Sequence, residues 1–112
     1  MKQFNRVFAP VNNERFDKSA LYDLANDTIF VCPVPMFDDI KDRHDLFEHY
    51  IDEHMKDFNP DTDCIADFGD SMIFAMMIFY VAMEHDRLYV ARYNRRASGY
   101  TIRLITTETD KW

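Results

Sequence analysis

Residues 71–84 read SMIFAMMIFYVAME, and the fold depends on whether this apolar segment forms a strand or a helix. Its apolar residues neither alternate with polar ones nor gather on one side of a helix, so periodicity does not decide. The segments 87–94 and 99–107 that follow are strand-like and are separated by turn residues. We therefore expect a C-terminal antiparallel meander with 73–83 as its inner strand, because a strand covered on both faces needs no alternation. A buried helix over 71–83 is the alternative.

The segment before it predicts an amphipathic helix over residues 37–58. Its apolar residues recur at helical spacing within a stripe about 80° wide, and acidic residues project from the other side. Asn59 and Pro60 end the helix. We expect the last four apolar residues of the stripe to face the sheet: Phe47, Ile51, Met55 and Phe58.

The N-terminal third predicts a short strand over residues 2–8, a helix capped by Asn13 or Asp17 and ending near Ala25, and a second strand over 28–31. Together with the later segments these elements predict a single α+β domain over residues 1–112. Its sheet is expected to be small and antiparallel, with three to five strands and one or two amphipathic helices packed on it.

Composition sets the class of protein. The chain has 112 residues, of which 47% are hydrophobic and 15% aromatic, so it can bury a core without metal or disulfides. Cys32 and Cys64 are expected to be free buried thiols, which favours a reducing compartment. The apolar run 72–83 is shorter than the roughly 20 residues that a membrane helix needs, and residues 1–6 lack a signal-peptide pattern. These features predict a soluble cytoplasmic protein.

Negative charge is concentrated in one part of the chain. Residues 37–70 carry twelve carboxylates and three basic side chains, a local net charge of −9 on a chain whose total is −7. Such a block of one sign creates a field that selects partners. The residues expected to bind a partner are Asp38, Asp42, Asp45, Asp52, Glu53, Asp61, Asp63, Asp67 and Asp70.

A rigid acidic face can occupy a site built for nucleic acid, because a groove lined with Lys and Arg attracts ordered carboxylates. Small anti-CRISPR and anti-restriction proteins work in this way, and this chain is similar to them in size and charge only. We therefore expect a non-enzymatic inhibitor of a nucleic-acid-handling complex that acts through residues 38–70 as a partial nucleic-acid mimic. Its partner is a basic protein surface, with no direct contact to nucleic acid or membrane. A face that merely solvates the protein explains the same charges.

The mimicry depends on how the acidic segments fold. Residues 38–57 carry a net charge of −5. That is roughly one charge per 6 Å of helix, against about one per 3.4 Å in a single DNA strand. The helix alone is therefore too sparse, and residues 61–70 must fold beside it to complete the surface.

Motifs for catalysis or metal binding are weak. His44, His49 and His54 lie on the predicted helix but point in different directions, without the spacing of a metal site. Residues 61–70 fail the pattern of a calcium loop. We expect no metal, no cofactor and no catalytic residue.

Two alternatives remain. Arg92, Tyr93, Arg95 and Arg96 lie on the C-terminal strands, where arginine can bind phosphate and tyrosine can stack on bases. They predict a small-ligand or nucleotide-binding protein instead. The Met- and Phe-rich surface could alternatively make the chain a homodimer.

Overall fold

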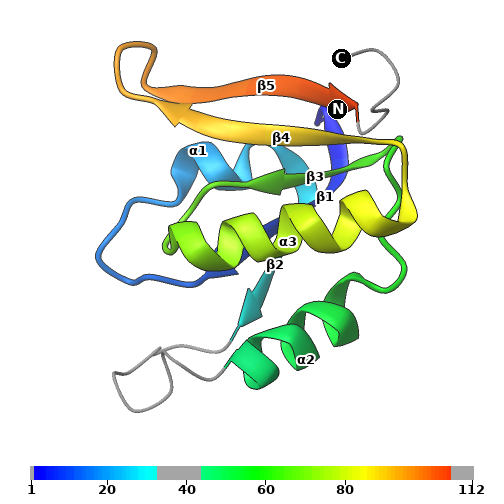
Figure 1. Cartoon of the computed structure of the whole chain (residues 1–112). Helices are drawn as coiled ribbons and strands as arrows, with labels where there is room; N and C mark the ends of the chain where they lie inside the picture. Colours follow the sequence, from blue (N-terminus) through cyan, green and yellow to red (C-terminus); the bar gives the residue numbers. More distant parts are fainter. Residues whose placement is uncertain (1, 33–43, 107–112) are drawn as a thin grey trace.

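The five strands form one mixed sheet in the order β2-β1-β3-β4-β5, shown in Figure 1. β1 pairs parallel with β2 and β3, β3 pairs parallel with β4, and β4 and β5 form an antiparallel hairpin. The computed structural model describes residues 2–32 and 44–106. Its elements are β1 (Phe4–Val11), α1 (Ser19–Tyr22), β2 (Ala25–Cys32), α2 (His44–Met55), β3 (Asp63–Ala66), α3 (Ser71–Glu84), β4 (Arg87–Asn94) and β5 (Gly99–Thr106).

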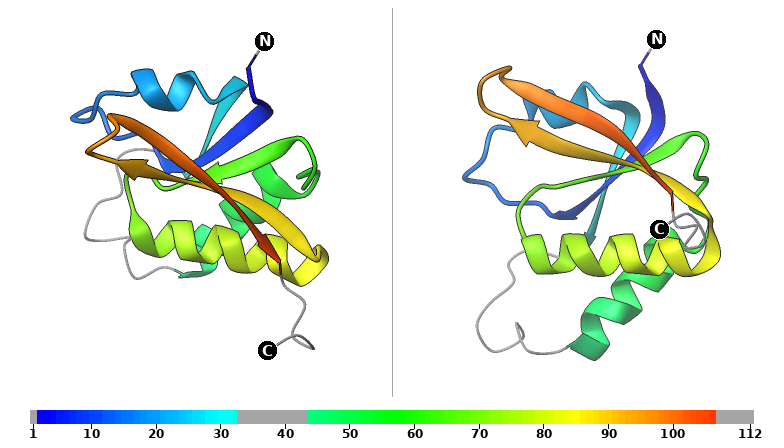
Figure 2. Two further views of the ribbon diagram at one scale, coloured as in Figure 1. Left: turned by 90° about the horizontal axis from the view of Figure 1, so that it is seen from above. Right: turned by 45° about the horizontal axis from the view of Figure 1, so that its top comes forward.

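The sheet separates two layers of helix, as the two views of Figure 2 show. α2 and α3 pack on one face and on each other, whereas the short α1 packs on the opposite face near β2 and β5. This arrangement follows from the parallel pairings, since each parallel connection must cross over a face of the sheet. The α+β class predicted from the sequence is confirmed.

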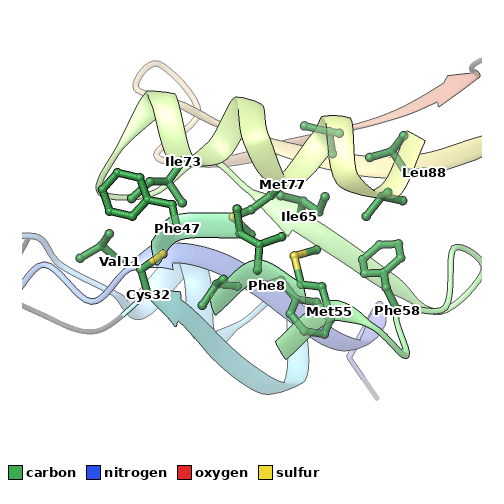
Figure 3. Packing of buried hydrophobic residues seen from close by; sticks show 14 residues of the cluster. Phe8, Val11, Cys32, Phe47, Met55, Phe58, Ile65, Ile73, Met77 and Leu88 are labelled. Atoms are coloured by element: carbon green, nitrogen blue, oxygen red, sulfur yellow. The ribbon is translucent and has the colours of Figure 1, made fainter. Parts of the chain in front are cut away.

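The larger core lies between the sheet and the α2–α3 layer (Figure 3). Phe47, Ile51, Met55 and Phe58 are between 1% and 5% exposed, so the predicted inward face of the acidic helix is confirmed. They meet residues such as Phe8 of β1, with ring centroids of Phe8 and Phe58 5.5 Å apart. Each large apolar side chain buried in this way contributes roughly 1.5 to 3 kcal/mol.

The predicted inner strand 73–83 is wrong, because residues 71–84 form the helix α3. Asp70 caps this helix, its carboxylate accepting a hydrogen bond from the backbone N–H of Ile73 at 2.9 Å. α3 buries Ile73, Met77 and Val81 and connects the parallel strands β3 and β4. Two parallel strands need a crossover connection of a dozen or more residues, usually a helix, and residues 71–84 provide it.

The inner position belongs instead to β3, which lies between β1 and β4. Its four residues Asp63–Ala66 are all buried, whereas the sequence predicted no strand between residues 58 and 73. Three of the four strand pairings are consequently parallel, and the expected antiparallel sheet is limited to the β4–β5 hairpin.

The remaining elements differ mainly in their ends. β1 and β2 extend beyond the predicted strands 2–8 and 28–31, and α1 has only four residues. The predicted start of the acidic helix over 37–43 lies outside the described residues. Among the helices that the structure describes, none is long and apolar enough to cross a lipid bilayer.

Candidate functional sites

The first candidate is the predicted acidic surface, and the carboxylates of its C-terminal half contact groups of their own chain. Asp63 is completely buried at the start of β3. Its Oδ2 accepts hydrogen bonds from the Arg6 guanidinium at 2.6 Å and from the backbone N–H of Asn59 at 2.9 Å. The bond to Asp63 is the main reason that the pKa of Arg6 is raised above its usual value. This carboxylate is an ion-pair partner of the sheet and is inaccessible to another molecule.

The other predicted acids of residues 61–70 also have partners in their own chain. Asp61 accepts a hydrogen bond from Nε of Arg87 at 3.1 Å. Asp67 Oδ2 lies 3.9 Å from Nε of Arg92, and Asp70 caps α3. These contacts reduce the negative charge that this segment offers to a partner, since arginines of the same chain compensate much of it.

The acids of α2 have a different setting. α2 contains Asp45, Glu48, Asp52 and Glu53 but no Lys or Arg, and all four are exposed. The first three are spaced i, i+3 and i+7, which places them in one row along the helix. Asp38 and Asp42, which were also predicted to bind a partner, lie outside the described residues.

An apolar groove runs between α2 and α3 beside this row, with a volume of about 650 Å³. α3 supplies most of its wall, including Met72, Phe79 and Met83, which are 55%, 68% and 71% exposed. Glu48 and Asp52 line the α2 side. We call this site the α2–α3 groove.

A hydrogen bond connects the two helices at the groove. The Tyr80 hydroxyl donates to Oδ1 of Asp52 at 2.8 Å. Burial, followed by this carboxylate, raises the pKa of Tyr80 to about 12, so the phenol remains a donor at neutral pH. The bond fixes the position of one rim carboxylate relative to the apolar wall.

The sequence did not predict the groove, because the expected strand over residues 73–83 has no helix face to form its wall. Its wall residues Met72, Met76, Phe79 and Met83 follow one another by three or four positions, the spacing of one helix face, and Ala75 lies three positions after Met72 on the same face. The available signal was the absence of any polar side on the segment. A helix that is apolar all round must be covered all round, and here the sheet and α2 cover only part of α3.

A second cavity of about 390 Å³ lies on the other side of the molecule, between the β1–α1 loop, the β3–α3 loop and the β4–β5 hairpin. Two of the predicted ligand-binding residues, Tyr93 and Arg95, line it. Arg92 and Arg96 lie with Arg103 on the adjoining surface of the hairpin. The structure thus gathers the predicted arginine and tyrosine residues around the hairpin.

The two cysteines are buried free thiols, and two histidines of α2 contact groups of their own helix. Burial raises the pKa of Cys32 to about 11 and that of Cys64 to about 12, so both thiols are protonated at neutral pH and unreactive. His49 lies 3.4 Å from Glu53, and Nδ1 of His54 lies 2.9 Å from the carbonyl oxygen of Tyr50. Over residues 2–32 and 44–106, no group of three or more His, Cys, Asp or Glu side chains is placed to hold a metal ion.

Comparison with known proteins found no matching family model, no matching curated protein and no matching solved structure.

Proposed function

We propose that this chain is a non-enzymatic binding protein whose α2–α3 groove takes up a basic amphipathic helix of a partner protein. The observation that carries the proposal is an apolar wall that includes Met72, Phe79 and Met83, bordered by the carboxylates of Glu48 and Asp52. Exposed apolar patches with a polar rim are typical of protein–protein interfaces.

The shape and chemistry of the groove favour a helix as its occupant. A groove between two helices accepts the apolar face of a third helix, whose anchoring side chains recur at positions i, i+3, i+4 and i+7. Methionine side chains adapt to different apolar partners, and Phe79 supplies an aromatic contact of the kind that dominates binding energy. The acidic row of α2 then selects a helix with Lys or Arg beside its apolar face.

A second copy of the chain fits the groove less well than a basic partner. A twofold dimer places the same surface of both copies against each other. It would bring Glu48 and Asp52 of one copy close to the same carboxylates of the other, and like charges at an interface are unfavourable.

We further propose that the partner belongs to a nucleic-acid-handling complex and that binding inhibits it, because basic surfaces are typical of such proteins. The four carboxylates of α2 are spread over 12 residues, which is roughly one charge per 4.5 Å of helix. That is closer to a single strand, at about one charge per 3.4 Å, than to a duplex. Mimicry by α2 is therefore partial, and the apolar wall supplies the remaining affinity. A cytoplasmic location is part of this proposal and accords with the two free thiols.

A titration with a synthetic peptide tests the groove directly. The probe is a Leu/Lys amphipathic peptide of about 18 residues, and its control is the same composition in an order without helical periodicity. We expect saturable binding of the periodic peptide, with a loss of at least about tenfold for Phe79→Ser and a smaller loss, greatest at low salt, for Asp52→Asn. Tyr22→Ser is the matched control, because Tyr22 is also an exposed aromatic residue, at 45% exposure, but lies on α1.

Equal binding of both peptides, or wild-type affinity in Phe79→Ser, would overturn the proposal. Light scattering tests the competing occupant. A dimer of the wild-type chain that becomes a monomer in Phe79→Ser would show that a second copy fills the groove.

A further inference from the structure

The carboxyl ends of β1 and β3 form a topological switch point. The chain leaves β1 toward α1 on one face of the sheet, and leaves the neighbouring strand β3 toward α3 on the other face. The two connections therefore diverge outside the strand ends (Figure 1), the position at which an open sheet with parallel strands has its crevice. In open sheets with parallel strands, ligands bind in this crevice.

The second cavity occupies this place. Its lining comes from the connections that follow three strands: Phe16 and Asp17 after β1, Asp67 and Phe68 after β3, and Arg95 after β4. Its volume of about 390 Å³ lies within the range of small-molecule sites.

Gly69 allows the β3–α3 loop to approach the end of β1. Its φ of +92° is in the region that favours glycine, and a Cβ at this position would lie 2.8 Å from the carbonyl oxygen of Val11. A side chain there would force the loop away from β1, so this glycine sets the dimensions of the cavity at its β1 side.

Aromatic rings from different elements surround the space. Phe16 and Phe68 meet edge to face with centroids 5.9 Å apart, and Tyr93 and Tyr100 do so at 5.6 Å. In each pair one ring is largely accessible, Phe16 at 53% and Tyr93 at 51% exposure. A flat heterocycle that contacts both exposed rings would stack on them and bury apolar area on each.

The charges around the cavity complement a phosphorylated sugar. Arg95 lines the cavity together with the carboxylates of Asp17 and Asp67. Arg92 is paired with Asp67 and alternates with Tyr93 along β4, so it projects from the other face of the hairpin. An anionic group in the cavity therefore has the Arg95 guanidinium as its cationic contact. The Asp17 carboxylate is oriented by the N–H and hydroxyl of Ser19, at 2.9 and 2.7 Å. It leaves acceptor capacity for the hydroxyl groups of a sugar.

We infer that this cavity binds a nucleoside phosphate. The base lies between Phe16 and Tyr93, the phosphate faces Arg95, and the sugar hydroxyls face the carboxylates of Asp17 or Asp67. A long polyanion is disfavoured as the ligand, because the chain carries a net charge of −7. This site is separate from the α2–α3 groove, which lies on the opposite face of the sheet.

Calorimetric titration of the full chain with the common ribonucleoside 5′-monophosphates tests the inference. Free nucleosides, inorganic phosphate and an oligothymidylate of about ten nucleotides serve as comparison ligands. We expect at least one monophosphate to bind at least about tenfold more tightly than its nucleoside or phosphate alone, because both ends are recognised. Tyr93→Ala and Arg95→Ala should each weaken binding at least about tenfold.

Control variants separate loss of a ligand contact from loss of the fold. Tyr22→Ala removes an equally exposed tyrosine outside the cavity, and Lys56→Ala removes an exposed cation beyond α2, and both should bind as the wild type does. Thermal unfolding of every variant checks that it is folded. Absence of binding by any monophosphate, equal binding by phosphate alone, wild-type affinity in Tyr93→Ala and Arg95→Ala, or binding of the oligonucleotide alone would each overturn the inference.

Discussion

Two sets of carboxylates from the same acidic stretch of sequence have opposite environments. Asp61, Asp63, Asp67 and Asp70 interact with arginines or backbone N–H groups of their own chain. The carboxylates of α2 are exposed beside an apolar groove, where Asp52 accepts a hydrogen bond from the Tyr80 hydroxyl and Glu53 lies 3.4 Å from His49. A high local charge in the sequence therefore does not equal a charged surface, because strand β3 draws part of that charge into the sheet.

The largest effect is expected at the buried ion pair. Asp63→Ala leaves the largely buried Arg6 guanidinium without its main partner. The free energy of unfolding should fall by about 3 kcal/mol or more. Urea denaturation measures this change. The control is Asp57→Ala, whose carboxylate also lies 3.2 Å from Arg6 but is 70% exposed, and which should cost less than about 1 kcal/mol.

A double variant sharpens the same test. Replacing both partners, as Arg6→Leu with Asp63→Leu, removes two buried charges together and should recover much of the lost stability. If Asp63→Ala costs no more than Asp57→Ala, the first set of carboxylates is not structural and the contrast between the two sets disappears.

The second prediction makes the comparison within one helix. Met77 is completely buried against the sheet, whereas Met83, also on α3, is 71% exposed in the groove wall. Met77→Ala should lower the free energy of unfolding by about 2 to 5 kcal/mol, and Met83→Ala should change it by less than about 0.5 kcal/mol. Met83→Ala should nevertheless weaken the basic amphipathic peptide. A destabilised Met83→Ala with unchanged peptide binding would contradict the assignment of this face.

The third prediction concerns pH. Burial raises the pKa of Cys32 to about 11 and of Cys64 to about 12, from 9.0 for an ordinary thiol. Above pH 9 the unfolded chain releases these protons while the folded chain retains them. The free energy of unfolding should therefore fall as pH rises, by up to about 1.4 kcal/mol per pH unit for each thiol.

Urea denaturation at pH 8 and pH 10 measures this slope. Cys64→Ala should reduce the slope, since one of the two thiols no longer contributes. Stability that rises with pH over this interval would show that the thiols are not buried as described. Tyr80 and Tyr100, whose pKa values are raised to about 12, add to the loss only above pH 10.

The elements with clear local patterns were predicted correctly from the sequence. The stripe on α2 and the β4–β5 hairpin were predicted correctly, because spacing and turn residues are local signals. The predictions were wrong at β3, which was not expected, and at α3, which was expected to be a strand. The strand Asp63–Ala66 is only four residues long and lies within an acidic stretch, so no local pattern predicts it. Its place is fixed by pairing with β1 and β4 and by the ion pair with the distant Arg6.

The candidate sites follow the same pattern. Tyr93 and Arg95 were identified from their residue types. Phe16, Asp17 and Asp67 join them only through the parallel topology, which no local pattern encodes. The groove likewise depends on α3 being a helix, whereas the sequence predicted a strand over residues 73–83.

The smallest effect is expected at Asp70. It belongs to the first set of carboxylates, which have partners in their own chain, but it interacts with only one helix end. Asp70→Ala removes the acceptor of the Ile73 N–H and should cost about 1 kcal/mol. Asp70→Asn is the matched variant, because asparagine caps a helix nearly as well without the charge, and it should retain most of the stability. A large loss in Asp70→Asn would instead assign the role of this residue to its charge. Neither variant should alter binding of the peptide at the α2–α3 groove, since Asp70 does not line it. Unchanged stability in Asp70→Ala would show that this carboxylate does not stabilise α3. It would then resemble the exposed carboxylates of α2 and be available to a partner.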